Sequence, residues 1–124
     1  MLSRGATVTT ARAFSAGDLR AFAGLSGAPA GAHVPEPLIA GMVSYLLGVH
    51  LPGPGTNYLK QDLRFEAPAP LDTEITAAVE VTRLRPEKQL VDLWARCTLP
   101  DGTLLCEGRA LVKAPAELFH GARA

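Results

Sequence analysis

Two side chains in the first half of the chain could move protons. His33 lies three residues before Glu36 in the segment His-Val-Pro-Glu-Pro, and imidazole and carboxylate groups are common general acids and bases in enzymes. The prolines on either side of Glu36 favour extended backbone, so we expect this carboxylate to face solvent. The segment therefore has two interpretations: an acid–base pair, or a loop histidine without a chemical role.

Two further polar side chains interrupt an apolar run. Residues 38–51, LIAGMVSYLLGVHL, are apolar almost all round. A run of this length predicts a helix of about four turns that other elements must cover on nearly every side. Ser44 and Tyr45 lie inside this run. They either line a tunnel for a ligand or satisfy a hydrogen bond within the core.

The two cysteines can be placed by a predicted C-terminal hairpin. If Asp101-Gly102 forms a two-residue turn, the numbers of cross-strand partners add up to 203. Cys97 then faces Cys106, and Leu99 faces Leu104. We expect reduced core thiols in preference to a redox pair. No spacing of Cys and His indicates a metal site.

The rest of the chain predicts an antiparallel sheet. Ser15 and Asp18 form an imperfect capping box at the start of a short helix, which Gly27 ends. Alternating apolar and polar residues predict strands at residues 6–14, 58–67, 73–85 and 89–114, the last folded at the hairpin turn. One apolar helix and a sheet with one apolar face predict an α+β fold, in which a curved antiparallel sheet wraps around one buried central helix.

Length and charge exclude several classes of protein. With 124 residues, the chain is expected to be one domain over residues 1–124, with a core that needs no disulfide or metal. Twelve basic and twelve acidic residues cancel, which argues against a nucleic acid or an anionic membrane as partner. No signal peptide is evident, and no apolar stretch approaches the ~20 residues of a membrane span. We therefore expect a cytoplasmic protein, and nothing in the sequence calls for a cofactor.

Three segments carry a family resemblance. They are FSAGDLRAFAGLSG at residues 14–27, SYLLGVHLPGPGTNYLKQDLRF at residues 44–65, and the terminal hairpin through CEGRALVKAP. In this order they resemble the MaoC-like (R)-specific hydratases and dehydratases, which act on 2-enoyl and 3-hydroxyacyl thioesters. The resemblance implies a single hot-dog domain. It also implies pairing with a second hot dog and an acyl tunnel near the helix and the dimer interface.

The chain differs from the family pattern at the family's catalytic segment, Asp-x-Asn-Pro-x-His. Residues 28–33 read Ala-Pro-Ala-Gly-Ala-His, so Ala28 takes the place of the Asp and Ala30 that of the Asn. Gly31 replaces the Pro, and only His33 is retained. His33 is therefore the candidate catalytic residue. The segment that begins at His33, His-Val-Pro-Glu-Pro, also resembles the His-Phe-Pro opening of bacterial 3-hydroxyacyl carrier-protein dehydratases.

The segment after His33 is shorter than the family's. The family has a His-Gly-Met at the start of the central helix, where a backbone amide polarises the thioester carbonyl. Ala40-Gly41-Met42 matches this triplet if the triplets are aligned, but a gap-free match over residues 44–65 shifts the helix and leaves the triplet unmatched. The resemblance makes Gly41, Ser44 and Tyr45 the candidate substrate-binding residues.

Three hypotheses follow from the resemblance. In the first, the chain is a non-catalytic subunit that pairs with a catalytic MaoC-like chain and shapes the acyl tunnel. In the second, it is a self-sufficient homodimeric hydratase or dehydratase that uses His33, alone or with Glu36. In the third, it binds an acyl thioester or a protein without turnover. The substrate would be carried by coenzyme A or by an acyl-carrier protein. An outward patch of Trp94, Leu90 and Leu111 is expected to contact the partner chain.

Overall fold

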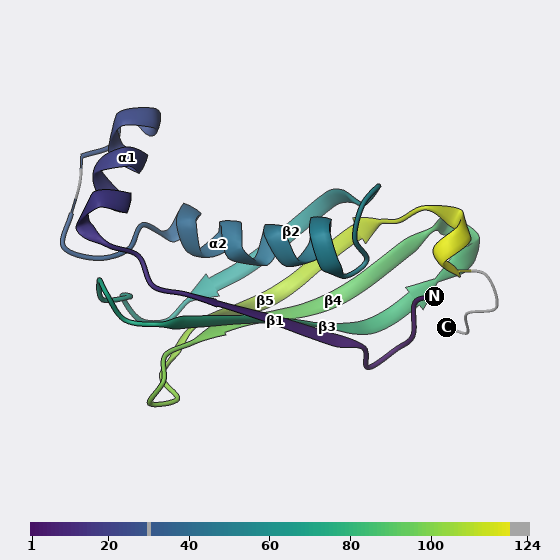
Figure 1. The fold of residues 1–124 in the computed structure, drawn as a ribbon. Coiled ribbons are helices and arrows are strands. Elements are labelled where there is room, and N and C mark those ends of the chain that lie inside the picture. Colours follow the sequence, from purple (N-terminus) through teal and green to yellow (C-terminus); the bar gives the residue numbers. More distant parts are fainter. Residues whose placement is uncertain (30, 120–124) are drawn as a thin grey trace.

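The structure is a computed structural model that describes residues 1–29 and 31–119 (Figure 1). Ala30 and His120 lie outside the described residues. The strands are β1 (Thr7–Arg12), β2 (Asn57–Phe65), β3 (Ile75–Arg85), β4 (Leu90–Thr98) and β5 (Leu104–Lys113). The helices are α1 (Ala16–Ser26), α2 (Glu36–Tyr45), the π-helical turn η1 (Leu46–His50), and the 3-10 turns η2 (Pro86–Lys88) and η3 (Ala116–Phe119).

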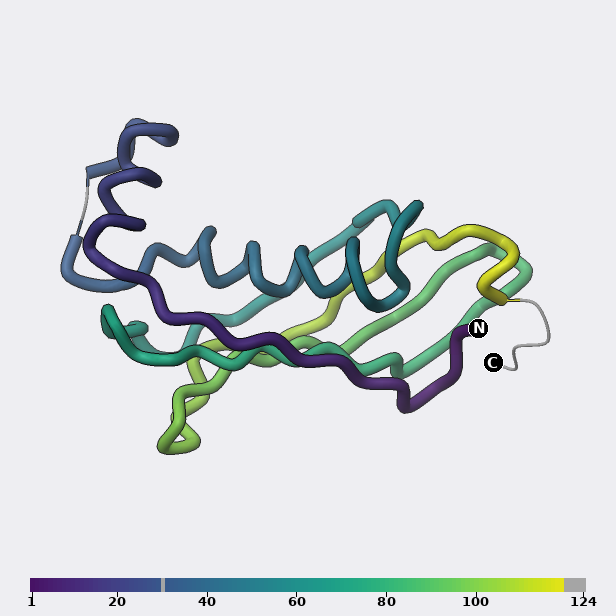
Figure 2. Tube along the Cα trace, in the orientation of Figure 1, coloured from purple at the N-terminus to yellow at the C-terminus, as the bar shows by residue number. Residues whose placement is uncertain are grey.

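The strands form a single antiparallel sheet in the order β1-β3-β4-β5-β2, so β1 and β2 are its edges. The helix formed by α2 and η1 lies along one face of this sheet (Figure 1). Figure 2 shows the chain passing from β1 into α1, which stands at one end of the sheet, and then back into α2. The predicted α+β class, with a curved antiparallel sheet around a central helix, is confirmed.

The start and end of α1 follow local rules that the sequence contains. The Ser15 side chain accepts a hydrogen bond from the Asp18 amide at 3.2 Å, and the Asp18 carboxylate accepts one from the Ser15 amide at 2.8 Å. Gly27 ends the helix in the left-handed conformation, with φ of 79°, which costs a residue without a Cβ little. The predicted capping box and helix end are confirmed.

The start of α2 differs from the prediction. Glu36 is the first residue of the helix and not part of an extended segment, with Pro35 as the N-cap and Pro37 inside the first turn. Proline is accepted there because the first N–H groups of a helix have no partner within the helix and proline's fixed φ suits the turn. The prolines therefore start the helix. The Glu36 side chain is exposed, as expected.

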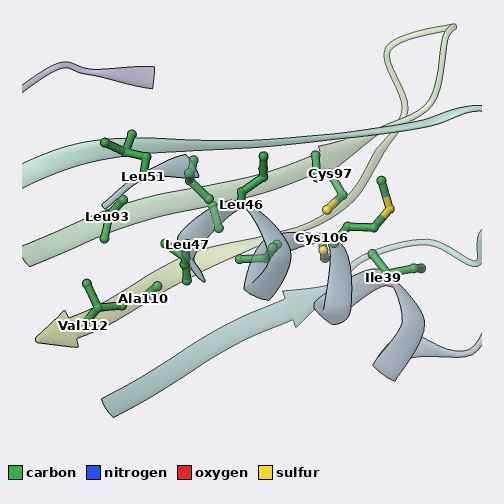
Figure 3. Close-up of a cluster of buried hydrophobic side chains, with 14 of the residues drawn as sticks. Ile39, Leu46, Leu47, Leu51, Leu93, Cys97, Cys106, Ala110 and Val112 are labelled. Atoms are coloured by element: carbon green, nitrogen blue, oxygen red, sulfur yellow. The ribbon is translucent and has the colours of Figure 1, made fainter. Parts of the chain in front are cut away.

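The core lies between the inner face of the central helix and the sheet. Ile39, Leu46 and Leu47 on the helix are at most 1% exposed. Figure 3 shows them against side chains of β4 and β5, namely Leu93, Cys97, Cys106, Ala110 and Val112. Both cysteines are free and fully buried. None of the described helices combines the length and the apolar character that crossing a membrane requires.

The outer face of the central helix is open in the single chain, contrary to the expectation that the helix is covered on nearly every side. Gly41, Ser44, Tyr45, Gly48 and Val49 are all exposed. One sheet can cover only one face of a helix, so the remaining apolar surface has no cover within the described chain.

The C-terminal hairpin confirms one predicted pair and corrects another. Cys97 pairs with Cys106 as predicted, but Leu104 pairs with Thr98 and not with Leu99. The Thr103 carbonyl accepts a hydrogen bond from the Leu99 amide at 2.9 Å, so the loop has three residues instead of two. Three-residue loops place their last residue in the left-handed region, and Gly102 has φ of 89°. An irregularity between Cys97 and Thr98 restores the predicted register.

An ion cluster lies on the sheet face away from the helix. Asp92 is 5% exposed, and its carboxylate accepts hydrogen bonds from Arg85 at 2.6 Å and from Arg109 Nε at 2.7 Å. Burial alone would raise the pKa of Asp92, but the hydrogen bonds and charges of the two arginines outweigh it and lower that pKa. Trp94, opposite Arg109 as predicted, is 43% exposed on this face.

We predict that Asp92→Asn lowers the free energy of unfolding at neutral pH by about 3 kcal/mol, because it leaves two arginines without their buried partner. The lowered pKa of Asp92 means that its stabilisation is present above the unfolded-state value of about 4 and is lost as the pH falls through the folded-state pKa. The free energy of unfolding, measured with urea from pH 2 to 7, should therefore change less with pH in the variant than in the wild type. Glu87→Gln, at an exposed turn, is the matched control. Parallel curves for Asp92→Asn and wild type would contradict the prediction.

Candidate active site at the start of the central helix

The backbone before α2 is tied to the chain that follows β2. His33 forms an isolated antiparallel bridge with Pro70, and the Val34 amide donates a hydrogen bond to the Ala69 carbonyl at 2.9 Å. Val34 is 4% exposed and anchors the segment in the core. His33 is thus exposed on a fixed backbone, directly ahead of the helix.

A cavity of about 520 Å³ opens at this point. Its walls come from residues 31–36, from Ile39 and from residues 65–69. His33 and Glu36 both line it, so the structure brings the two predicted proton carriers to one cavity. Among the described residues that line this cavity, Glu66 is the one other ionisable side chain. No hydrogen bond joins the side chains of His33 and Glu36 within the described chain.

The helix start has one unbonded backbone donor, on a residue that lines this cavity. The first four N–H groups of a helix have no partner one turn earlier. At the start of α2, Pro35 and Pro37 have no N–H, and the Leu38 amide donates to the Pro35 carbonyl at 3.1 Å. The Glu36 amide is left as the donor at the positive end of the helix dipole, where developing negative charge is stabilised.

These groups suit proton-transfer chemistry at a polarised carbonyl. An imidazole can accept and return a proton, a carboxylate can hold a water molecule, and an amide at a helix start can stabilise an enolate oxygen. The cysteines do not add a nucleophile, because both thiols are fully buried in the core and neither lines the cavity. Within residues 1–29 and 31–119, no group of three His, Cys, Asp or Glu side chains could hold a metal.

A second cavity, of about 430 Å³, lies on the other flank of α2. Gly41 and Tyr45 line it, whereas Ser44 is exposed and lines neither cavity. The two cavities share no lining residue. Neighbouring residues at the helix start line different cavities, Glu36 the first and Pro37 the second.

The structure adds contacts that the sequence did not predict. Arg12 and Phe14 line the second cavity from the β1 side, with the Arg12 guanidinium 4.7 Å from the centre of the Phe14 ring. The hydroxyl of Tyr45 and Nε2 of His50 are 3.2 Å apart. No periodic pattern in the sequence links β1 to α2, because some two dozen intervening residues separate them.

Comparisons with known proteins place this chain among characterised relatives. No family model matches it. It is 38% identical over 130 residues to the (R)-specific enoyl-CoA hydratase of Rhodospirillum rubrum, covering 93% of this chain and 90% of the relative. The solved (R)-hydratase of Aeromonas caviae, involved in PHA biosynthesis, superimposes with a TM-score of 0.87 at 36% identity and covers 92% of this chain and 98% of its own.

A more distant structure shares only the fold. The ChsH1-ChsH2 complex from Mycobacterium tuberculosis matches with a TM-score of 0.75 at 14% identity, covering 93% of this chain and 100% of the matched chain. That structure is a complex of two differently named chains.

Proposed function

Since the chain belongs to the MaoC-like family of (R)-specific enoyl-CoA hydratases and has its hot-dog fold, we propose that it is itself a hydratase or dehydratase of acyl thioesters. It would add water to a 2-enoyl thioester or remove water from an (R)-3-hydroxyacyl thioester. The observation that carries this proposal is the meeting of His33, Glu36 and the Glu36 amide at one cavity.

Each group has a role in the hydration direction. The thioester carbonyl lies at the Glu36 amide, which stabilises the oxygen as negative charge develops on it. Glu36 holds a water molecule through its carboxylate. His33 takes a proton from this water while the water oxygen bonds to Cβ of the substrate. His33 then delivers that proton to Cα, so that one water is added across the double bond. Because both events occur on one face in a syn addition, a single imidazole can serve both.

The two cavities suit the two arms of such a substrate. The first cavity is lined by ionisable groups, His33, Glu36 and Glu66, and suits the polar pantetheine arm. The second is lined mostly by apolar side chains, including Phe14 and Met42, beside the single charged side chain of Arg12, and suits the acyl tail, whose transfer out of water is favourable. The thioester would cross the helix start, and Gly41 and Tyr45 would bind the tail. Ser44 would lie beside this path on the open helix face.

The open face of the central helix supports pairing with a second copy. Residues 37–49 contain no charged side chain, and Gly41, Tyr45 and Val49 on the outer face are exposed. An uncharged face of this kind is typical of an interface. In the proposed homodimer this face is covered, and the partner chain closes the second cavity from above.

A second candidate function is supported by the segment before His33. The family resemblance sets Ala28 in place of the catalytic Asp, and alanine can neither accept nor deliver a proton. If Glu36 does not supply this function, the chain acts as a non-catalytic subunit that completes the acyl tunnel of a catalytic MaoC-like partner. If the chain also completes no catalytic partner, it is an acyl-thioester-binding module without turnover.

The first prediction concerns turnover by the purified chain alone, with a short (R)-3-hydroxyacyl pantetheine thioester as substrate. We expect formation of the enoyl thioester, and a loss of at least about a hundredfold in kcat/KM for His33→Ala, the size expected for a general base. Glu36→Gln should lower kcat more than it raises KM. Glu87→Gln, which removes an exposed carboxylate far from the cavity, is the matched control and should retain wild-type rates.

Absence of turnover in wild type would reject the self-sufficient enzyme. Two further measurements then separate the other hypotheses. Recovery of activity on mixing with a catalytic MaoC-like hydratase would support the subunit, and thioester binding without recovery would support the binding module. Light scattering should give a homodimer if the first proposal is right.

A second prediction tests the acyl path without requiring turnover. Within the chain, a Cβ at Gly41 would meet no atom within 4 Å, so Gly41→Leu should fill the second cavity without a clash inside its own chain and without loss of helix stability. We expect decanoyl-pantetheine to bind at least about tenfold more weakly by calorimetry, since several methylene groups lose their apolar site. Gly24→Leu, in α1 and equally open, should bind as wild type does. Equal affinities for both variants would contradict the assignment.

A further inference from the structure

The last turn of the central helix changes its hydrogen-bonding pattern. The Leu51 amide donates to the Leu46 carbonyl at 2.8 Å, five residues back, and η1 is π-helical over Leu46–His50. In a continuous α-helix, each residue advances by about 100°, so His50 would lie about 140° around the axis from Tyr45. The wider π turn carries residue i+5 back toward residue i.

This turn creates a side-chain pair that an α-helix would not. Nε2 of His50 lies 3.2 Å from the Tyr45 hydroxyl. Their rings meet edge to face, with centroids 5.3 Å apart and an interplanar angle of 76°. Both residues are exposed, and Tyr45 is 48% exposed. The contact with His50 holds the Tyr45 ring in one of the rotamers that its side chain could adopt.

Tyr45 occupies the end of the second cavity. The helix residues that line this cavity follow one face, namely Pro37, Leu38, Gly41, Met42 and Tyr45. The next residues on this face are Gly48, which has no side chain, and Val49, and neither lines the cavity. The tyrosine ring is thus the last wall, about 12 Å along the helix from Pro37 at 1.5 Å per residue.

We infer that His50 is a positioning residue which, through the Tyr45 hydroxyl, fixes the tyrosine ring as the end wall of the acyl site and so limits the length of acyl chain accepted. This inference rests on the proposed function, because it takes the second cavity as the acyl site. His50 touches no reacting atom and acts through Tyr45. Acyl chains that pass the wall would have to displace the ring and break its contact with His50.

The test is the ratio of affinities for decanoyl- and butanoyl-pantetheine, measured by calorimetry on the full chain. Tyr45→Ala should raise this ratio by about tenfold, because each methylene newly buried strengthens binding roughly fourfold. Tyr45→Phe and His50→Leu should each raise it about threefold by freeing the ring. The double variant should show the same threefold change, since both substitutions remove one interaction. His50→Gln, whose amide can still reach the hydroxyl, should restore the wild-type ratio.

The outcomes separate this inference from the proposal beneath it. Failure of wild type to bind either thioester would overturn both. Binding of both thioesters with an unchanged ratio in His50→Leu, or additive effects in the double variant, would overturn the role of His50 alone. Melting temperatures of all variants show whether a change in the affinity ratio reflects loss of folding. If loss of folding were the cause, His50→Gln would not have the wild-type ratio.

Discussion

The rest of the structure depends on the packing of one apolar helix face against one face of the sheet. Val43 and Leu46 are completely buried there, as are Leu93 and Val112 on the strands beneath. Because protein interiors are close-packed, this contact fixes both the height and the rotation of the helix over the sheet. The rotation decides which helix residues line the flanking cavities and which remain open. The candidate site is therefore a consequence of core packing.

The start of the same helix sets the chemistry. Two prolines remove N–H groups that a helix start would otherwise offer, and the Leu38 amide is already bonded. One amide, that of Glu36, remains, and Glu36 and His33 line the same cavity. A helix start with several free amides would bind a carbonyl in several ways. In the proposed reaction, this single donor gives the thioester one orientation with respect to His33.

Family membership determines the fold of this chain more strictly than the side chains of its site. The relatives share the fold and about a third of the residues, which is ample to preserve a core and its helix. A core is conserved by packing, whereas proton transfer depends on a few side chains. In the alignment that the resemblance implies, Ala28 stands at the position of a catalytic carboxylate, a change that would leave the fold intact. In the proposed reaction, Glu36, three residues after His33 and lining the same cavity, supplies the carboxylate.

The sequence alone determined the features that depend on neighbours and periodicity. The strand alternation and the Ser15 capping box follow from local rules, because the period of the apolar residues and the types of the capping residues can be read directly from the chain. Tertiary structure decided the rest. A bulge in the hairpin moved the Leu99 pairing, and the wide π turn, invisible to a 3.6-residue period, joined Tyr45 to His50. Which cavities exist, and which side chains share them, depends on packing between segments far apart in the sequence.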